Sequence, residues 1–312
     1  MSFLRMIQEH GAAAGESAGQ AAEHGAEAAA SHGLSSIPEI PEYISHHLQD
    51  ARQFEFAGLH WDLNTLAFPP LHLGPITLDL SPTRQLLFIL LAAALCIAIF
   101  VPVAKALTGR GTSKAPRGFA NAMEALVLYF RDNVVRTNIG HGADAYTPFI
   151  LTIFFFILFM NVLGLTPFGV TPTSNLSVTA ALAIISFIVT EVSGMRALGP
   201  AGYAQTIFYL PPGLPTVMKP IMLVIMAPVE FLGKLTKPFA LAVRLFANMM
   251  AGHILILAIV GLILVTQSFV VGGVSVLIMS ALMILELFVA CLQAYIFAML
   301  TSVFIGLIRH AH

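Results

Sequence analysis

The chain has 312 residues and a formal net charge of −1 at pH 7, with 57% hydrophobic and only 10% charged residues. A soluble domain carries about a quarter charged residues, so we expect most of this surface to face lipid. The near-neutral charge and the lack of a basic stripe or zinc-type Cys/His spacing exclude nucleic-acid binding. Neither a metal site nor a cofactor is expected.

The first part of the chain, residues 1–80, differs in composition from the rest. It is rich in Ala, Gly, Glu and His and has no apolar core of the signal-peptide type. Its histidines match no known spacing of metal ligands. We therefore predict an N-terminal extramembrane tail, part helical and part disordered.

Residues 81–312 are predicted to form an all-α integral membrane domain with five membrane segments. Two stretches without charge, residues 85–104 and 145–190, and a long apolar run over residues 221–308 mark the segments, because one helix needs about twenty apolar residues to cross a bilayer. Pro167 and Gly169 divide the second stretch into two helices, and Gln267 and Ser268 interrupt the last one. The expected spans are about 85–105, 146–166, 176–195, 221–267 and 271–308.

Between the first two spans, residues 117–137 are predicted to form an amphipathic interfacial helix. One face can hold the apolar residues Ala122, Ala125, Leu126, Tyr129, Phe130 and Val134, while Arg131, Asp132 and Arg136 remain in water. Such a helix is expected to lie on the inner membrane surface. A contact site for a partner subunit is the alternative.

The last two spans are too long to stand upright in a bilayer. Ile221 to Thr266 would extend about 69 Å as continuous helix, whereas the hydrocarbon core is about 30 Å thick. We therefore expect a long, strongly tilted helical hairpin that packs against a curved partner.

Basic residues indicate the orientation of the chain. They follow the first, third and last spans, at Lys105, Arg110, Arg196, Lys219 and Arg309. With five crossings, all of these positions fall on one side. The N-terminus is therefore expected outside and the C-terminus in the cytoplasm.

Polar residues inside the hairpin are functional hypotheses by default, because ionisable groups in a membrane cost several kcal/mol. The set comprises Glu230, Arg244, Asn248, His253, Glu286 and Gln293. If the turn lies near residue 270, His253 is about 17 residues before it and Glu286 about 16 after it. Asn248 and Gln293 match in the same way. Two polar pairs across the hairpin are therefore predicted.

The chemistry of these residues suits proton transfer. His253 and Glu286 can exchange protons near neutral pH, whereas Arg244 cannot release its proton. With no second carboxylate at its level, Arg244 is predicted to meet one on a partner. The structural alternatives are self-satisfied polar pairs between helices and an ordinary ion pair of Glu230 with a nearby lysine.

Two segments carry a family resemblance. KPFALAVRLFANMMAGH (Lys237–His253) and LQAYIFAMLTSVFI (Leu292–Ile305) resemble the signatures of the a subunit of F-type ATP synthases. The resemblance extends over about 82–308. It implies a stator subunit with two proton half-channels against the rotating c-subunit ring, in a bacterial inner membrane. It also implies peripheral stalk b subunits and other ATP synthase subunits as partners, and no catalytic site on this chain.

The resemblance assigns roles residue by residue. Arg244 matches the arginine that separates the half-channels and balances the ring carboxylate, and Glu230 matches an acid of the inner half-channel. The expected outer half-channel contains His253, Glu286, Asn248 and Gln293, with Asn161 as a further candidate. At position 164, a glycine stands where some relatives carry an acid.

Two other classes of function compete with this interpretation. A self-contained secondary transporter or proton channel would often show internal repeats, and none is convincing here. An intramembrane enzyme would need a nucleophile or metal cluster, and neither a His-Glu-x-x-His motif nor a Gly-rich phosphate loop is present. Protons are favoured over sodium because His253 and Glu286 can form a proton relay.

Overall fold

The computed structural model describes residues 83–108, 118–166, 171–208, 215, 218–266 and 269–310, and the backbone of four strands before them. The chain divides into two compact units. One contains residues 1–51 and 254–280, and the other contains residues 52–253 and 281–312. All the polar residues singled out in the sequence lie in the second unit.

Four short strands precede the first long helix. Strand β1 (Gln53–Phe56) pairs antiparallel with β2 (Leu59–Asp62), and β3 (Leu71–Leu73) pairs antiparallel with β4 (Ile76–Leu78). The described part of the predicted tail therefore forms strands rather than helix or disorder, and the alternation of polar and apolar residues in β1 and β2 is typical of strands. The rest of the predicted tail lies outside the described residues.

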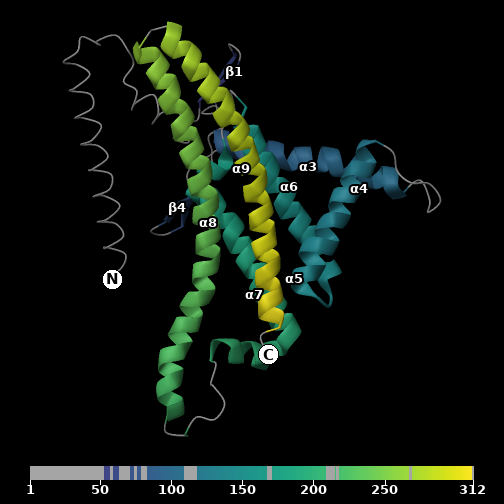
Figure 1. The fold of residues 1–312 in the computed structure, drawn as a ribbon. Coiled ribbons are helices and arrows are strands. Elements are labelled where there is room, and N and C mark those ends of the chain that lie inside the picture. The colour runs from purple at the N-terminus through teal and green to yellow at the C-terminus, as the bar shows by residue number, and fades with distance from the viewer. Residues whose placement is uncertain are drawn as a thin grey trace. The chain divides into compact units, whose positions relative to one another are not determined.

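Among the described residues, five helices are long and apolar enough to cross a membrane, which agrees with the predicted number (Figure 1). They are α3 (Arg84–Thr108), α6 (Thr147–Gly164), α7 (Leu176–Ile207), α8 (Met218–Thr266) and α9 (Phe269–Arg309). Helices α8 and α9 contain 49 and 41 residues, about twice the length that a perpendicular span needs. The strong tilt of this hairpin stays a prediction.

The predicted interfacial segment is helical but not uniformly α-helical. Helix α4 (Phe119–Tyr129) continues into the π-helix η2 (Phe130–Arg136) and the short α5 (Thr137–Ile139). Phe130 and Val134 are buried as expected, but Ala122, Ala125 and Tyr129 of the predicted face are exposed. Val135 joins the buried residues because the wider π turn changes which residues share a face. The π turn lies where η2 contacts α6 and α9.

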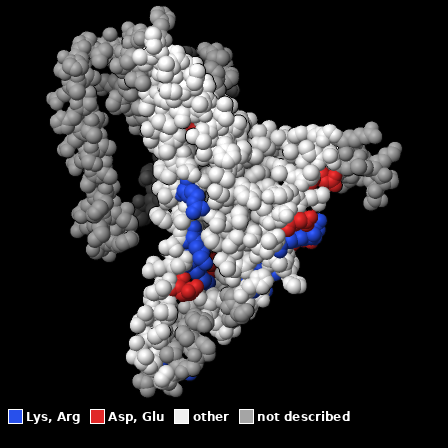
Figure 2. All heavy atoms as spheres, in the orientation of Figure 1, with Lys and Arg blue, Asp and Glu red and all other residues white. Residues whose placement is uncertain are grey.

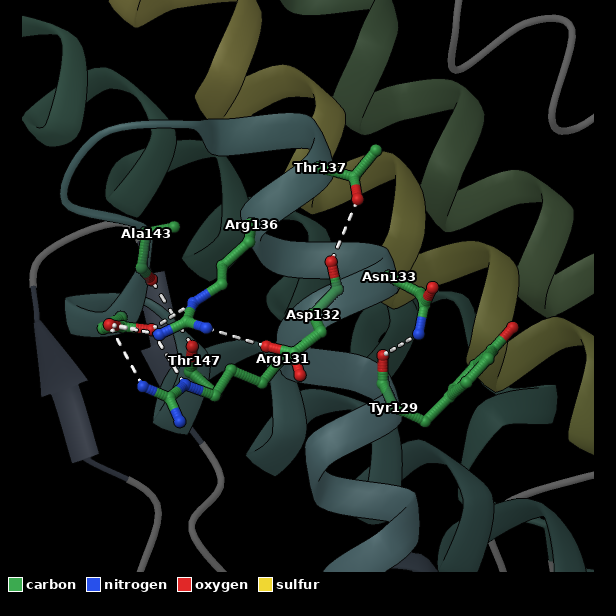
Figure 3. A network of polar contacts seen from close by, with 9 residues as sticks. Tyr129, Arg131, Asp132, Asn133, Arg136, Thr137, Ala143 and Thr147 are labelled. Atoms are coloured by element: carbon green, nitrogen blue, oxygen red, sulfur yellow. Dashed lines mark hydrogen bonds and ion pairs between the residues drawn. The ribbon is translucent and has the colours of Figure 1, made fainter.

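An ionic network ties η2 to the beginning of α6 (Figure 3). Asp144, in the 3₁₀ turn η3 (Ala143–Ala145), accepts hydrogen bonds from Arg131 Nε at 2.9 Å and Arg136 Nε at 3.0 Å. Arg136 also donates to Asp132 at 2.9 Å. The two guanidinium groups hold the pKa of the Asp144 carboxyl well below its usual range.

Buried aromatic and small residues bring α6, η2 and α9 together. Phe130 of η2 packs on Phe154 of α6, with ring centroids 4.3 Å apart. In α9, Ala290, Ala294 and Ala298 are fully buried at four-residue intervals, which is a spacing that lets helices approach closely. The helices that carry the polar residues are therefore held by a packed core.

Both ends of α7 are shaped by particular residues. At its start, Asn175 accepts a hydrogen bond from the Ser177 backbone at 2.8 Å and donates one to Gln85 of α3 at 2.6 Å. Near its end, Gly199 has φ 71°, a left-handed conformation that favours glycine, and Pro200 follows it. The last residues of α7 therefore turn away from the direction of the main helix.

Candidate functional site

The first predicted polar pair is present. Asn248 Nδ2 of α8 donates to Gln293 Oε1 of α9 at 2.9 Å, and Gln293 is only 3% exposed. The hydrogen bond shows that the two helices lie side by side at this level (Figure 1). The pairing predicted by counting from the hairpin turn is confirmed.

The second predicted pair, His253 with Glu286, also faces across the hairpin. His253 Nδ1 lies 3.9 Å from Glu286 Oε1, and the Glu286 side chain is only 8% exposed. A Cβ added at Gly252 would be 1.7 Å from the same oxygen. Glycine at position 252 therefore leaves the space in which the Glu286 carboxylate lies.

A threonine that the sequence analysis did not single out completes this group. Thr171 Oγ1 lies 3.0 Å from His253 Nε2, and Thr171 is 1% exposed. A Cβ added at Gly164 would be 1.9 Å from Thr171 Oγ1. The space beside position 164 is thus filled by a hydroxyl that contacts the histidine.

Asn161 is fully buried and has partners on two sides. Its Oδ1 accepts a hydrogen bond from Thr173 at 2.6 Å, and its Nδ2 donates to the Ala290 carbonyl at 3.3 Å. Thr173 belongs to η4 (Pro172–Ser174), the turn that directly follows Thr171. Asn161 therefore holds the turn that presents Thr171, and its place in a proton path stays a prediction.

Arg244 differs from these residues because it is exposed on α8. In the described ranges, no side chain forms an ion pair or hydrogen bond with it. Ala240, Ala247 and Ala251 are exposed at positions −4, +3 and +7 from it, so they share its face. A cation surrounded by small side chains leaves room for a closely packed partner.

On the other side of Arg244 along α8, charged residues surround a cavity. Figure 2 shows blue and red atoms gathered along α8, and a second blue and red group to the right of it. The cavity has a volume of about 110 Å³, and residues of α7, α8 and α9, including Glu230 and Lys234, line it. The structural alternative required an ion pair between Glu230 and a nearby lysine. Lys234 instead pairs with Glu191 of α7, with its Nζ 3.5 Å from the carboxylate.

The five apolar helices of the described part of the chain, together with the polar pairs between them, indicate a multi-pass membrane protein. The model of the family described as ATP synthase A chain matches residues 86–306. The subunit a of Chloroherpeton thalassium is 43% identical over 84% of this chain and 75% of its own length. That of Anaeromyxobacter dehalogenans strain 2CP-C is 42% identical over 96% and 80%, respectively.

A third relative, subunit a 2 of Chlorobaculum tepidum, is 40% identical over 85% of this chain and 72% of its own length. The chain belongs to the ATP synthase A chain family, whose members are stator subunits of the membrane sector of ATP synthases and translocate protons. The resemblance recognised in the sequence is thereby confirmed.

Proposed function

We propose that this chain provides two proton half-channels, one on each side of Arg244, against a rotating ring of c subunits. The observation that supports this most directly is the exposed Arg244, which has no acidic partner within the described parts of the chain. A fixed cation inside a bilayer costs several kcal/mol, so a carboxylate outside the chain is the expected partner.

In the proposed outer half-channel, protons pass through the group around His253 and Glu286. The 3.9 Å between their side chains allows transfer through one water or after a small side-chain movement. Thr171 holds the far side of the imidazole, and the Asn248–Gln293 pair continues the polar sequence toward Arg244. Asn161 contributes by fixing the turn that carries Thr171.

The proposed inner half-channel begins at the cavity beside Glu230. Arg244 separates it from the outer path because a guanidinium cannot release its proton at any accessible pH. A proton must therefore bind to a carboxylate of the ring and be carried by rotation from one path to the other. Each proton falling through 100 mV releases about 2.3 kcal/mol, which rotation of the ring makes available for ATP synthesis.

Membership of the family supports the proposed assembly. The partners are the c-subunit ring, peripheral stalk b subunits, other ATP synthase subunits and the lipid bilayer. This chain carries no catalytic site of its own, and nucleotide chemistry takes place on the other subunits. It lies in a bacterial inner membrane with its N-terminus outside and its C-terminus in the cytoplasm.

The test is ATP-driven proton uptake into vesicles that contain the whole complex. We expect Arg244→Ala to abolish coupled uptake while the complex remains assembled, because no fixed cation then separates the two paths or balances the ring carboxylate. Arg196→Ala is the matched control, since Arg196 is also exposed but lies on α7. Normal uptake by Arg244→Ala would refute the separator role.

Copurification tests the assembly itself. The tagged chain should carry with it an oligomeric ring and a soluble part that hydrolyses ATP. A chain that purifies alone and conducts protons in empty vesicles would instead be the self-contained channel considered above.

A further inference from the structure

A nearly buried ion pair joins α7 to α8 on the inner side of Arg244. Lys234 Nζ lies 3.5 Å from Glu191 Oε2, and the two side chains are only 10% and 13% exposed. Lys234 also donates to Thr206 Oγ1 at 2.9 Å, and its ammonium lies 4.4 Å from the centre of the Tyr203 ring. The Tyr203 hydroxyl donates to the same Glu191 oxygen. Lys234 is therefore held on the α7 side.

This arrangement is unexpected because α8 itself offers Lys234 an acidic neighbour. Glu230 lies four residues before Lys234, and glutamate four residues before lysine is the favourable order for an ion pair on a helix. Among the residues that the structure describes, Glu230 nevertheless forms no ion pair. Lys234 thus forms its ion pair with Glu191 and not with Glu230.

The bend in α7 makes this arrangement possible. Glu191 and Tyr203 are twelve residues apart, which would separate them by about 18 Å along a straight helix. Gly199, with φ 71°, and Pro200 break the helix and turn the chain between them. The bend returns Tyr203 and Thr206 to the level of Glu191, where they meet Lys234.

The cavity next to this cluster leads from Glu230 toward Arg244. Its wall includes Leu241, three residues before Arg244, and Ser186, whose buried hydroxyl has no partner in the described ranges. The charged residues of the cavity are Glu191, Glu230, Lys234 and Lys237, and α9 contributes only apolar side chains. Lys237 Nζ lies 5.5 Å from the centre of the Phe304 ring. Within the cavity, Glu230 is therefore the carboxylate without an ion pair.

We propose that Glu191 is a positioning residue that holds Lys234 on α7 and so leaves Glu230 unpaired and able to exchange protons with the inner solution. This inference rests on the proposed function, because it assumes that protons pass through the cavity. Without Glu191, Lys234 can turn to Glu230 and stabilise its ionised form. Proton uptake from the inner side then becomes less favourable.

The test measures ATP-driven proton uptake by the whole complex in vesicles. The variable is the pH of the medium outside the vesicles, which contacts the proposed cytoplasmic side of the complex and thus the inner half-channel. ATP-driven pumping takes protons from this medium, so the rate of proton uptake falls as the pH of the medium rises. We expect Glu191→Gln to move the fall to a pH about one unit lower, because a cation within about 5 Å disfavours a protonated carboxyl by at least that amount. At a fixed pH on the falling limb, the rate is then about 10-fold lower.

The double variant Glu191→Gln with Lys234→Gln distinguishes positioning from other roles. It removes the lysine together with the residue that holds it, so the pH profile should return to that of the wild type. The matched control is Lys219→Gln, which removes a lysine of α8 outside the cavity and should leave the profile unchanged. If little Glu191→Gln complex assembles, Glu191→Asp replaces it, with a smaller shift in the same direction expected.

Two results would overturn the inference. An unshifted profile in Glu191→Gln would show that Glu191 does not govern Glu230. A double variant as impaired as the single one would show that Glu191 acts by itself or only supports the fold. Arg244→Ala is measured in parallel: if it pumps normally, the proposed function fails, whatever the Glu191 variants show.

Discussion

At the scale of single residues, the outer path depends on the space around the Glu286 carboxylate. Both of its oxygens are buried without a hydrogen bond from the described residues, and one lies in the space beside Gly252. The carboxylate is therefore placed by packing, with His253 as its ionisable neighbour. A small change in shape at Gly252 should change proton transfer.

Gly252→Ala tests this placement. The added Cβ would be 1.7 Å from Glu286 Oε1, so the carboxylate must move away. We expect ATP synthesis driven by an imposed proton gradient to fall by about 10-fold or more, because a displacement of 1 Å can cost about 100-fold. Gly233→Ala on the same helix is the control, since its Cβ would meet nothing within 4 Å. Equal rates for the two variants would contradict the placement.

The residues show what could be predicted from sequence and what could not. The Asn248–Gln293 and His253–Glu286 pairs followed from counting residues on each side of the turn, because a helix has a regular rise. Thr171 escaped notice because its place depends on how the turn after α6 folds back. The polar run that begins at Thr171 was its only signal in the sequence.

Among the elements, the π-helix η2 is fixed by contacts at both ends of its sequence. Asn138, just beyond η2, donates to the Val134 carbonyl at 2.7 Å, and Ser302 of α9 donates to the same carbonyl at 3.1 Å. Asp144 links Arg131 and Arg136 to the start of α6. A carbonyl freed from the α-helical pattern is therefore used by another helix.

The Asp144 contacts give the element a pH dependence. Because the pKa of Asp144 is lowered in the folded chain, its stabilising effect is present above the unfolded pKa of about 4. The effect is lost as the pH falls from there through the folded value. We expect the Tm difference between wild type and Asp144→Asn to be constant above about pH 5 and to shrink below about pH 4.

The measurement is the loss of helical circular dichroism in the detergent-solubilised chain, with the pH as the variable. Asp132→Asn serves as a comparison because Asp132 contacts only Arg136 in this network. A Tm difference that grows toward low pH would contradict the assignment.

The bend at Gly199 and the π-helix were not predicted, because both are selected by tertiary contacts rather than by hydrophobic periodicity.

For the whole molecule, the number of membrane helices could be predicted from the apolar runs in the sequence, and an orientation could be proposed from the basic residues between them. Runs of about twenty residues without charge are a strong signal, because a bilayer tolerates few charged groups. The Glu191–Lys234 pair was missed because Glu191 was counted with the end of a span, and its partner is distant in the sequence. Pairings across helices need the packing as well as the pattern.

The proposed orientation can be tested with a thiol reagent that does not cross membranes. In a chain whose Cys96 and Cys291 are replaced by alanine, Ser177→Cys should react from outside intact cells. Lys219→Cys should react only after the cells are opened, because it follows a loop on the proposed cytoplasmic side. Both positions are exposed, which makes them comparable. The opposite pattern would reverse the topology.

The contact between Thr171 and Gly164 also limits how such chains can diverge. The threonine hydroxyl occupies the position where the first side-chain carbon of any residue larger than glycine would stand. A lineage that acquires an acid at position 164 must therefore lose or move Thr171 first, or change both together. The steric overlap therefore excludes an intermediate that carries both the acid at position 164 and Thr171 in its present place.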